Sequence, residues 1–397
     1  MTEAVPSYRD PKNPGAPIIP RATWDLGPYN RWTFQNVRDL TPTTRVWRGR
    51  QPASDLPEAL EPIGGIRFTH DGIEHSIDDV LAETFTDGFL VLHRGRIIAE
   101  TYSNGMRRQT THLSQSVAKS VTGTVAGILI HQGLIDPQAP VTAYLPELES
   151  TAYRGATLQH VLDMTSGVLF DESYTAADSH MAKVDAACGW KEPKDDSWPQ
   201  SMWQFILTLT EAECAHGESF SYRSIETDIL AHIMQRVTGK MLADLVSEHL
   251  WVPLGAEEDG YFTVDRGGYA LADGGFNATL RDYGRFAQMI TDGGVFNGRR
   301  IVPAAWIEAT RTGGNHALFG ADYRRVLPNG AYHNQFWIED VDRPVLIGRG
   351  VFGQILYMDQ AAEFTAVKLS SWPDFLNADR ARLTFAAIRA IRDALVG

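Results

Sequence analysis

The apolar segment of residues 114–132 constrains the fold more than any other part of the chain. Its apolar residues follow a helical spacing, and small residues such as Gly123 and Gly127 would let neighbouring elements approach the backbone closely. We therefore expect a buried helix. Its first turn carries Ser116 and Lys119, and side chains three residues apart lie on the same face of a helix.

A hydroxyl and an amine placed in this way predict an activated nucleophile. A neutral Lys119 amine could take the proton of Ser116, which is the Ser-Lys version of a nucleophile and its base. Backbone N–H groups are free at the beginning of a helix, so negative charge is favoured there. For Lys119 to act as a base we expect burial to depress its pKa. The spacing alone is weak evidence, because a chain of this length contains one such pair by chance about as often as not.

The composition restricts the classes of protein to which this chain can belong. The 397 residues predict one large domain or two interleaved ones. The net charge of −13 argues against a nucleic-acid partner. The two cysteines, Cys188 and Cys214, are too few for a disulfide scaffold, and we expect both to be reduced. The sequence shows no secretory signal and no run of ~20 apolar residues, so we expect a cytoplasmic protein without a membrane partner.

The organisation of the chain predicts three regions. Residues 1–60 lack periodicity and are expected to wrap over the body as an N-terminal arm, whereas residues 157–274 alternate helical patterns with loops. Residues 61–156 and 275–397 contain a hairpin pattern around Arg94-Gly95, recurrent strand-like runs and a C-terminal helix. We expect an α/β (α+β) protein with an antiparallel sheet, completed by both ends of the chain and flanked by helices, and an inserted all-helical region.

Four short motifs follow one another along the chain in an order that resembles a known superfamily. Residues 116–119 (Ser-Val-Ala-Lys) are followed by residues 135–148, by residues 162–167 (Leu-Asp-Met-Thr-Ser-Gly) and by residues 222–224 (Tyr-Arg-Ser). This order resembles the serine β-lactamase-like superfamily, in its class C β-lactamase, DD-peptidase and esterase branch. The resemblance covers residues ~85–370 and implies the β-lactamase/DD-peptidase-like fold.

Three further segments indicate a narrower family within this superfamily. Residues 30–32 (Asn-Arg-Trp), 185–190 (Asp-Ala-Ala-Cys-Gly-Trp) and 368–373 (Lys-Leu-Ser-Ser-Trp-Pro) resemble the 6-aminohexanoate-dimer hydrolases, the nylon-oligomer amidases of this superfamily. Nearly the whole chain shares this likeness.

The resemblance implies a role for each matching residue of the reaction centre. Ser116 matches the nucleophile, Lys119 matches its proton acceptor, and Tyr222 matches a general acid/base that serves the leaving group. A phenol has a pKa near 10, but a neighbouring lysine cation would favour the phenolate and allow proton transfer.

The resemblance also implies substrate contacts. Tyr174 matches a tyrosine that hydrogen-bonds the substrate, and Asp185 matches an aspartate that anchors the distal ammonium group of the substrate. Trp190 is expected to line the cleft. Asp273 stands where the nylon-oligomer hydrolases have Asn, a departure that could alter the orientation or the range of substrates.

The third motif departs from the penicillin-recognising enzymes. Where those enzymes have Lys-Thr-Gly, the candidate here is Gly348-Arg349-Gly350, followed by Val351, whose backbone N–H would complete an oxyanion hole with that of Ser116. Gly353-Gln354 is the alternative. The missing lysine disfavours a β-lactamase or DD-peptidase. Retention of Ser116, Lys119 and Tyr222 disfavours a non-catalytic penicillin-binding-like protein.

These inferences define one expected activity. The chain is predicted to be a serine hydrolase that cleaves linear amides of the 6-aminohexanoate-oligomer type, and short-chain carboxylic esters, through a Ser116 acyl-enzyme. We expect a small-molecule amide or ester as its partner and no cofactor. None of the 12 histidines has the His-Glu-x-x-His spacing, so no metal is expected. A homodimer and a monomer are both compatible with the sequence.

Overall fold

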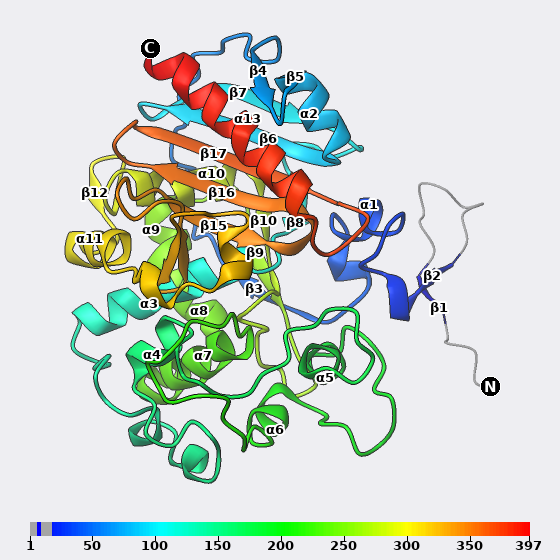
Figure 1. The fold of residues 1–397 in the computed structure, drawn as a ribbon, viewed down its shortest axis with the longest axis vertical. Coiled ribbons are helices and arrows are strands. Elements are labelled where there is room, and N and C mark those ends of the chain that lie inside the picture. The colour runs from blue at the N-terminus through cyan, green and yellow to red at the C-terminus, as the bar shows by residue number, and fades with distance from the viewer. Residues whose placement is uncertain (1–5, 9–17) are drawn as a thin grey trace.

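The computed structural model describes residues 6–8 and 18–397, and Figure 1 shows their arrangement. Residues 1–5 and 9–17 of the expected N-terminal arm lie outside the described residues. A sheet with helices on both faces occupies one half of the view, and a largely helical layer occupies the other half (Figure 1).

The main sheet has seven strands in the order β13-β14-β15-β16-β17-β6-β7, and every neighbouring pair is antiparallel. The predicted hairpin is β6 and β7, with Arg94 and Gly95 at positive φ in the turn. Pairing of β17 with β6 joins the two ends of the chain in one sheet, as the sequence predicted. The strands are β6 (Thr86–His93), β7 (Arg96–Tyr102), β13 (Ala331–His333), β14 (Phe336–Ile338), β15 (Leu346–Gly350), β16 (Gln354–Asp359) and β17 (Phe364–Ser370).

Helices cover both faces of this sheet because its strands are apolar on both sides. In β6, Phe89 and Val91 belong to the core cluster that also holds Phe385 and Ile388 of α13 (Ala378–Val396). Leu90 belongs to the larger cluster on the opposite side, with residues of α3 (Val117–His131) and α10 (Leu280–Thr291). Successive residues of the strand thus pack alternately into the two hydrophobic clusters.

A smaller sheet has four strands in the order β3-β9-β10-β8. Strand β3 comes from the expected arm, and β9 lies within the range expected to be mainly helical. Their cross-strand pairs include Thr44 with Phe262 and Arg45 with Tyr261. The strands are β3 (Thr43–Val46), β8 (Thr111–Leu113), β9 (Gly260–Thr263) and β10 (Phe276–Thr279).

Helix α3 is the buried helix that the sequence predicted, since every residue from Val117 to Leu129 is buried. A Cβ on Gly127 would lie 2.2 Å from the Trp306 ring, and one on Gly123 would lie 2.6 Å from Gln335. Neighbouring elements therefore reach the helix backbone, and this close packing fixes the position of its first turn.

The remaining elements complete the helical layer and the periphery. Helix α7 ends at Gly239, which adopts the left-handed conformation that glycine accepts without strain. The other helices are α1 (Asn30–Thr33), α2 (Ile77–Glu83), α4 (Leu158–Leu162), α5 (His180–Ala187), α6 (Met202–Ile206), α7 (Ile225–Thr238), α8 (Leu242–Val246), α9 (Val252–Leu254), α11 (Ala304–Thr312) and α12 (Ala321–Arg324), and the other strands are β1 (Pro6–Tyr8), β2 (Ile19–Pro20), β4 (Arg67–His70), β5 (Ile73–Ser76), β11 (Val295–Phe296) and β12 (Arg299–Arg300).

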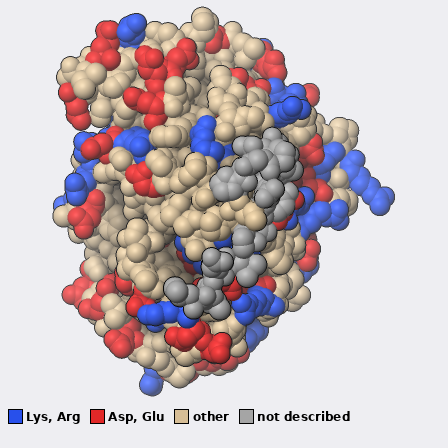
Figure 2. Space-filling model, turned by 90° about the vertical axis from the view of Figure 1, so that its right-hand side faces the viewer, with Lys and Arg blue, Asp and Glu red and all other residues tan. Residues whose placement is uncertain are grey.

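Acidic and basic side chains are interspersed on the surface, and Figure 2 shows both signs on the face that it presents. In the described part of the chain, no helix combines the length and the apolar character needed to cross a membrane.

Candidate active site

The site is built on the turn that precedes α3. Ser114 fixes this turn to β10, because its backbone N–H and its hydroxyl both donate to the carbonyl of Phe276, at 3.0 and 3.1 Å. Gln115 takes a positive φ of 51°, and Ser116 follows it directly before the helix. The Ser116 side chain therefore stands at the N-terminal end of α3, where backbone N–H groups are unpaired.

Lys119 lies one helical turn further on, and its Nζ donates to Ser116 Oγ at 3.0 Å. The same ammonium donates to the backbone carbonyl of Asp273 at 2.8 Å, and its Nζ lies 3.8 Å from Asp273 Oδ2. The structure thus brings the two predicted residues into direct contact in the interior.

The predicted depression of the Lys119 pKa is wrong. Burial does lower the pKa of Lys119, but Tyr222, Asp273 and Glu172 act in the opposite direction and raise it above its ordinary value. Acidic groups on three other segments surround this amine, and the local helix sequence gives no sign of them. The resting site therefore holds an ammonium.

Tyr222 occupies the segment just before α7. Its backbone N–H donates to the Tyr323 hydroxyl at 2.9 Å, and its ring stacks on Trp337 with centroids 5.2 Å apart. Lys119 Nζ lies 5.1 Å from the centroid of the Tyr222 ring. Burial raises the pKa of Tyr222, whereas the charge of Lys119 and a hydrogen bond with Ser116 lower it in part. The resting tyrosine is thus a neutral phenol beside a lysine cation.

Glu172 belongs to the site, although sequence reasoning gave it no role. It accepts hydrogen bonds from the Tyr174 hydroxyl at 2.7 Å, from the Ser224 N–H at 2.9 Å and from the Ser224 hydroxyl at 2.5 Å. Burial raises the pKa of Glu172 to about 7, against the charge of Lys119. Its place two residues before Tyr174 in the sequence is the one signal that points to it.

The predicted oxyanion donor lies at the end of β15. Val351 follows Gly350 directly and lines the same cavity as Ser116. The alternative residues lie elsewhere: the Gln354 side chain accepts from the Ser370 N–H at 3.0 Å and donates to the Ser370 carbonyl at 2.6 Å. A Cβ on Gly353 would meet the Trp372 ring at 2.3 Å. This geometry favours Val351 over Gly353-Gln354.

The four predicted substrate contacts also lie together. A small cavity of about 20 Å³ is lined by Ser116, Val351 and all four of these residues, namely Tyr174, Asp185, Trp190 and Asp273. Burial raises the pKa of Asp273 and outweighs the effect of Lys119. The indole of Trp190 donates to Thr263 Oγ1 at 3.2 Å, so the ring is fixed.

Asp185 has a partner of its own. Lys191 Nζ lies 2.9 Å from Asp185 Oδ2 and 3.1 Å from Asp25 Oδ2. One lysine thus joins two carboxylates from distant segments, and the predicted ammonium anchor is ion-paired within the chain.

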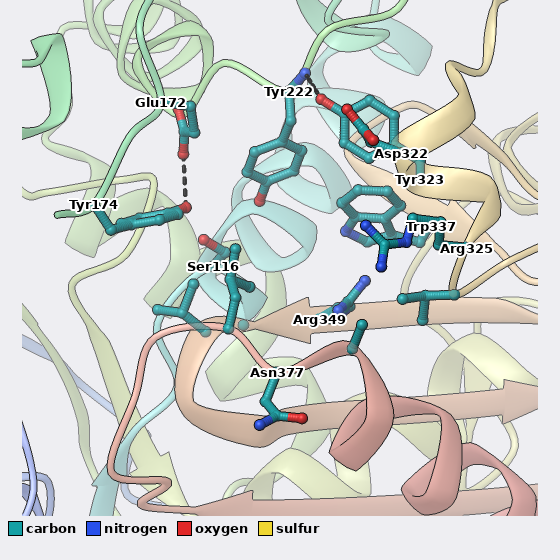
Figure 3. A pocket seen from close by; sticks show the side chains of 15 residues that line it. Ser116, Glu172, Tyr174, Tyr222, Asp322, Tyr323, Arg325, Trp337, Arg349 and Asn377 are labelled. Atoms are coloured by element: carbon teal, nitrogen blue, oxygen red, sulfur yellow. Dashed lines mark hydrogen bonds between the residues drawn. The ribbon is translucent and has the colours of Figure 1, made fainter. Parts of the chain in front are cut away.

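A larger cavity of about 400 Å³ opens beside the nucleophile, as Figure 3 shows. Its volume falls in the usual range for small-molecule sites. Its lining residues are Ser116, Glu172, Tyr174, Tyr222, Asp322, Tyr323, Arg325, Val326, Trp337, Arg349, Gly350, Val351, Leu376, Asn377 and Ala378. Across residues 6–8 and 18–397, no three His, Cys, Asp or Glu side chains form a group that could hold a metal ion.

A cavity that holds a Ser-Lys contact and a tyrosine is typical of serine acyl hydrolases, and the family comparison agrees. Residues 77–390 match the family described as Beta-lactamase, so the chain belongs to that family and is a hydrolase.

Comparison with individual proteins adds detail to the family assignment. The chain is 38% identical over 356 residues to a 6-aminohexanoate-dimer hydrolase of Paenarthrobacter ureafaciens, which covers 89% of this chain and 88% of the relative. A solved structure assigned as a 6-aminohexanoate-dimer hydrolase from Bacillus anthracis superposes with a TM-score of 0.86, at 28% identity, over 94% of this chain and 96% of the other. Esterase EstB of Burkholderia gladioli is 26% identical over 170 residues, 42% of each chain. These relatives confirm the family resemblance and the fold class that the motifs predicted.

Proposed function

We propose that the protein cleaves linear amides and short-chain carboxylic esters through an acyl-enzyme on Ser116. The observation that carries this proposal is the 3.0 Å contact between Lys119 Nζ and Ser116 Oγ in a cavity that Tyr222 also lines. Similarity to a 6-aminohexanoate-dimer hydrolase and to an esterase supports the two substrate classes.

Activation begins with the Lys119–Tyr222 pair. At rest the pair holds an ammonium and a phenol, so the pair must lose one proton before it can serve as a base. The deprotonated pair then accepts the Ser116 proton while Oγ forms a bond to the carbonyl carbon of the substrate. The carbonyl π electrons move to oxygen, and the N–H groups of Ser116 and Val351 stabilise this oxyanion.

Collapse of the tetrahedral intermediate reverses the proton transfer. The pair protonates the leaving nitrogen or oxygen, the C–N or C–O bond breaks, and an ester of Ser116 remains. Water enters as the leaving group departs and gives a proton to the same pair as it attacks the ester carbon. Ser116 regains its proton, and the carboxylic acid is released.

The acyl part of the substrate is proposed to lie towards Asp185 and Trp190. Asp25, Lys191 and Asp185 together carry one more negative than positive charge when both carboxyls are ionised, so this cluster can still attract an ammonium group. The relative's name specifies 6-aminohexanoate dimer. We propose amides of this type, with an amine at the acyl end, as substrates.

The alternatives make different predictions for the same site. A β-lactamase or DD-peptidase would turn over nitrocefin, and a non-catalytic penicillin-binding-like protein would turn over nothing. We further propose that the protein acts on a small molecule and binds neither nucleic acid nor a membrane. We place it in the cytoplasm, as a monomer or a homodimer.

A labelling experiment tests the proposal directly. The parent protein should react with a fluorophosphonate and should hydrolyse p-nitrophenyl acetate and 6-aminohexanoate dimer in preference to nitrocefin. Ser116→Ala should lose the label and at least about a thousandfold in kcat, because a triad-type nucleophile contributes that much or more. A correctly folded Ser116→Ala protein that keeps its activity would disprove the proposed nucleophile.

A further inference from the structure

Arg349 lines the large cavity and has no counter-ion within the described chain. Its side chain is mostly buried, and among residues 6–8 and 18–397 it makes no hydrogen bond and no ion pair. Its Cζ atom lies 5.8 Å from the centroid of the Trp337 ring. Burial lowers the pKa of Arg349, but a guanidinium remains protonated in proteins.

Other interior arginines of this chain are paired. Arg223 forms an ion pair with Glu213, Arg281 pairs with Glu100 at 2.5 Å, and Arg285 pairs with Asp282 at 3.0 Å. A guanidinium that faces a cavity without a carboxylate partner can pair there with an anion through charge-assisted hydrogen bonds. The unpaired guanidinium of Arg349 therefore points to an anion that comes from outside the chain.

A second arginine faces the same part of the cavity. Figure 3 shows Arg325, Arg349 and Trp337 together on one side of the pocket and Glu172 with Tyr174 on the opposite side, with Tyr222 between them. Asp322 also lines the cavity, but in the described structure no ion pair joins it to either arginine. Arg325 is exposed and Arg349 is partly buried, so Arg349 carries the argument and Arg325 adds a second positive charge to this end of the cavity.

The arginines lie on the side of the site that receives the leaving group. Tyr222, the proposed proton donor to that group, stacks on Trp337, and Arg349 lies against the same indole. Asp185 and Trp190, which are proposed to face the acyl part, line the smaller cavity. A substrate that spans the nucleophile would thus carry its leaving group past Tyr222 towards Arg349.

We propose that Arg349, assisted by Arg325, binds a carboxylate on the leaving-group part of the substrate. The preferred substrates are then amides whose amine portion is an amino acid with a free carboxylate. A planar guanidinium can bind a carboxylate through two parallel hydrogen bonds. This inference rests on the proposed hydrolase function and specifies the substrate class of that same site.

Binding to an inactive protein tests the carboxylate site without relying on turnover. Hexanoate and hexanamide are titrated calorimetrically into Ser116→Ala protein, and hexanoate should bind at least about tenfold more tightly, because a hydrogen bond to a charged group contributes about 1.5–3 kcal/mol. Arg349→Met in the same background should remove the preference, and Arg349→Lys should retain part of it. Equal binding of the two ligands, or no detectable binding of hexanoate at millimolar concentration, would overturn the proposal.

Kinetics give the second measurement. The ratio of kcat/KM for 6-aminohexanoate dimer to that for its C-terminal amide should fall by roughly 10- to 100-fold in Arg349→Met. Arg299→Met removes an exposed positive charge from β12 and controls for the change in net charge, so it should leave the ratio unchanged. A ratio that Arg349→Met does not change would contradict the assignment. Fluorophosphonate labelling that succeeds while the hexanoate preference is absent would leave the hydrolase proposal intact and disprove the carboxylate site alone.

Discussion

At the scale of single residues, the reaction centre is an ammonium held among acidic groups. Lys119 contacts Ser116 and the carbonyl of Asp273, and its pKa is raised although burial alone would lower it. A lysine in this environment becomes a base only after the Lys119–Tyr222 pair loses a proton. The pH dependence of the reaction therefore reports on the pair and not on an isolated lysine.

Activity should consequently rise with pH. The deprotonated form of the pair becomes more populated as pH increases, so kcat/KM for p-nitrophenyl acetate should increase from neutral into alkaline solution. Lys119→Arg cannot lose its proton and should be as inactive as Lys119→Ala. Initial rates between pH 6 and pH 10 check both expectations. An active Arg variant, or a rate that declines above neutrality while the protein stays folded, would remove Lys119 from the base role.

Asp185 gives a second prediction at this scale. If its carboxylate attracts the substrate ammonium, Asp185→Asn should reduce kcat/KM for 6-aminohexanoate dimer roughly 10- to 100-fold more than kcat/KM for p-nitrophenyl acetate. The dimer carries an ammonium and the ester carries no charge. Measuring both substrates on one preparation controls for losses of folded protein. Parallel losses would mean that Asp185 serves only its ion pair with Lys191.

The sequence predicts the centre of the site better than its surroundings. Ser116, Lys119 and Tyr222 lie in short motifs with fixed spacing, and the structure brings all three together. Glu172 received no role, because its importance depends on burial and on hydrogen bonds from Ser224, which is distant in the sequence. Arg349 was placed only within the candidate third motif, because its lack of a carboxylate partner is a property of the folded chain. Such properties have no local sequence pattern.

At the scale of elements, the site depends on how closely β15 approaches the turn before α3. A Cβ on Gly350 would lie 2.5 Å from the carbonyl oxygen of Ser114 and 3.0 Å from Gln115 Cβ. Val351 is the next residue, so any displacement of this strand moves the proposed oxyanion donor. By contrast, a Cβ on Gly348 would meet nothing closer than 3.5 Å.

Two alanine substitutions on one strand therefore form a matched pair. Gly350→Ala should push β15 away from Ser116 and reduce kcat by about 10²-fold, the size of effect seen when one oxyanion donor is removed. Gly348→Ala should keep most of the activity, because 3.5 Å is ordinary van der Waals contact. Comparing kcat and thermal unfolding of both variants separates misplacement of the donor from a loss of folding. Equal activity in the two variants would argue against Val351 as the donor.

The elements themselves were largely predictable. The β6–β7 hairpin, the strands β14 to β17 and the helices α3 and α13 follow from apolar periodicity and turn residues. The four-stranded sheet does not, because its strands have only three or four residues each and come from three distant parts of the chain. These short segments become strands because they pair with one another in the folded chain. An alternating apolar pattern can be recognised in a sequence only over longer runs.

At the scale of the whole molecule, the N-terminal segment is tied to the substrate side of the site. Asp25 and Asp185 share Lys191, and Arg21 donates to the carbonyl of Gly189. Trp24 packs edge-on against Trp190, with ring centroids 5.3 Å apart. The residues around the predicted ammonium anchor are therefore positioned by a segment that precedes the catalytic motif by about ninety residues of sequence.

Lys191→Met should destabilise the protein in a pH-dependent way. Burial raises the pKa of Asp25 to about 6 and also raises the pKa of Asp185, while Lys191 holds both down. An acid whose pKa is raised on folding contributes stability that is present below its unfolded pKa and is lost as pH rises through the folded value. Without Lys191 both folded pKa values move higher, so this loss becomes larger and extends above pH 6. The variant should approach parental stability near pH 5 and lose about 3 kcal/mol or more at pH 8, as expected for an uncompensated buried charge.

Urea unfolding at pH 5 and pH 8 measures this difference, and Lys194→Met is the matched control. Lys194 pairs with Asp178 at 2.6 Å on the surface, where both side chains are more than half exposed. An exposed pair of this kind contributes at most about 1 kcal/mol, so the control should change little at either pH. Destabilisation of Lys191→Met by the same amount at both pH values would show that Lys191 acts through packing against its neighbours. A loss of stability that appears only at the higher pH would instead establish that Lys191 stabilises the two carboxylates through its charge, and so holds the N-terminal segment against the substrate cleft.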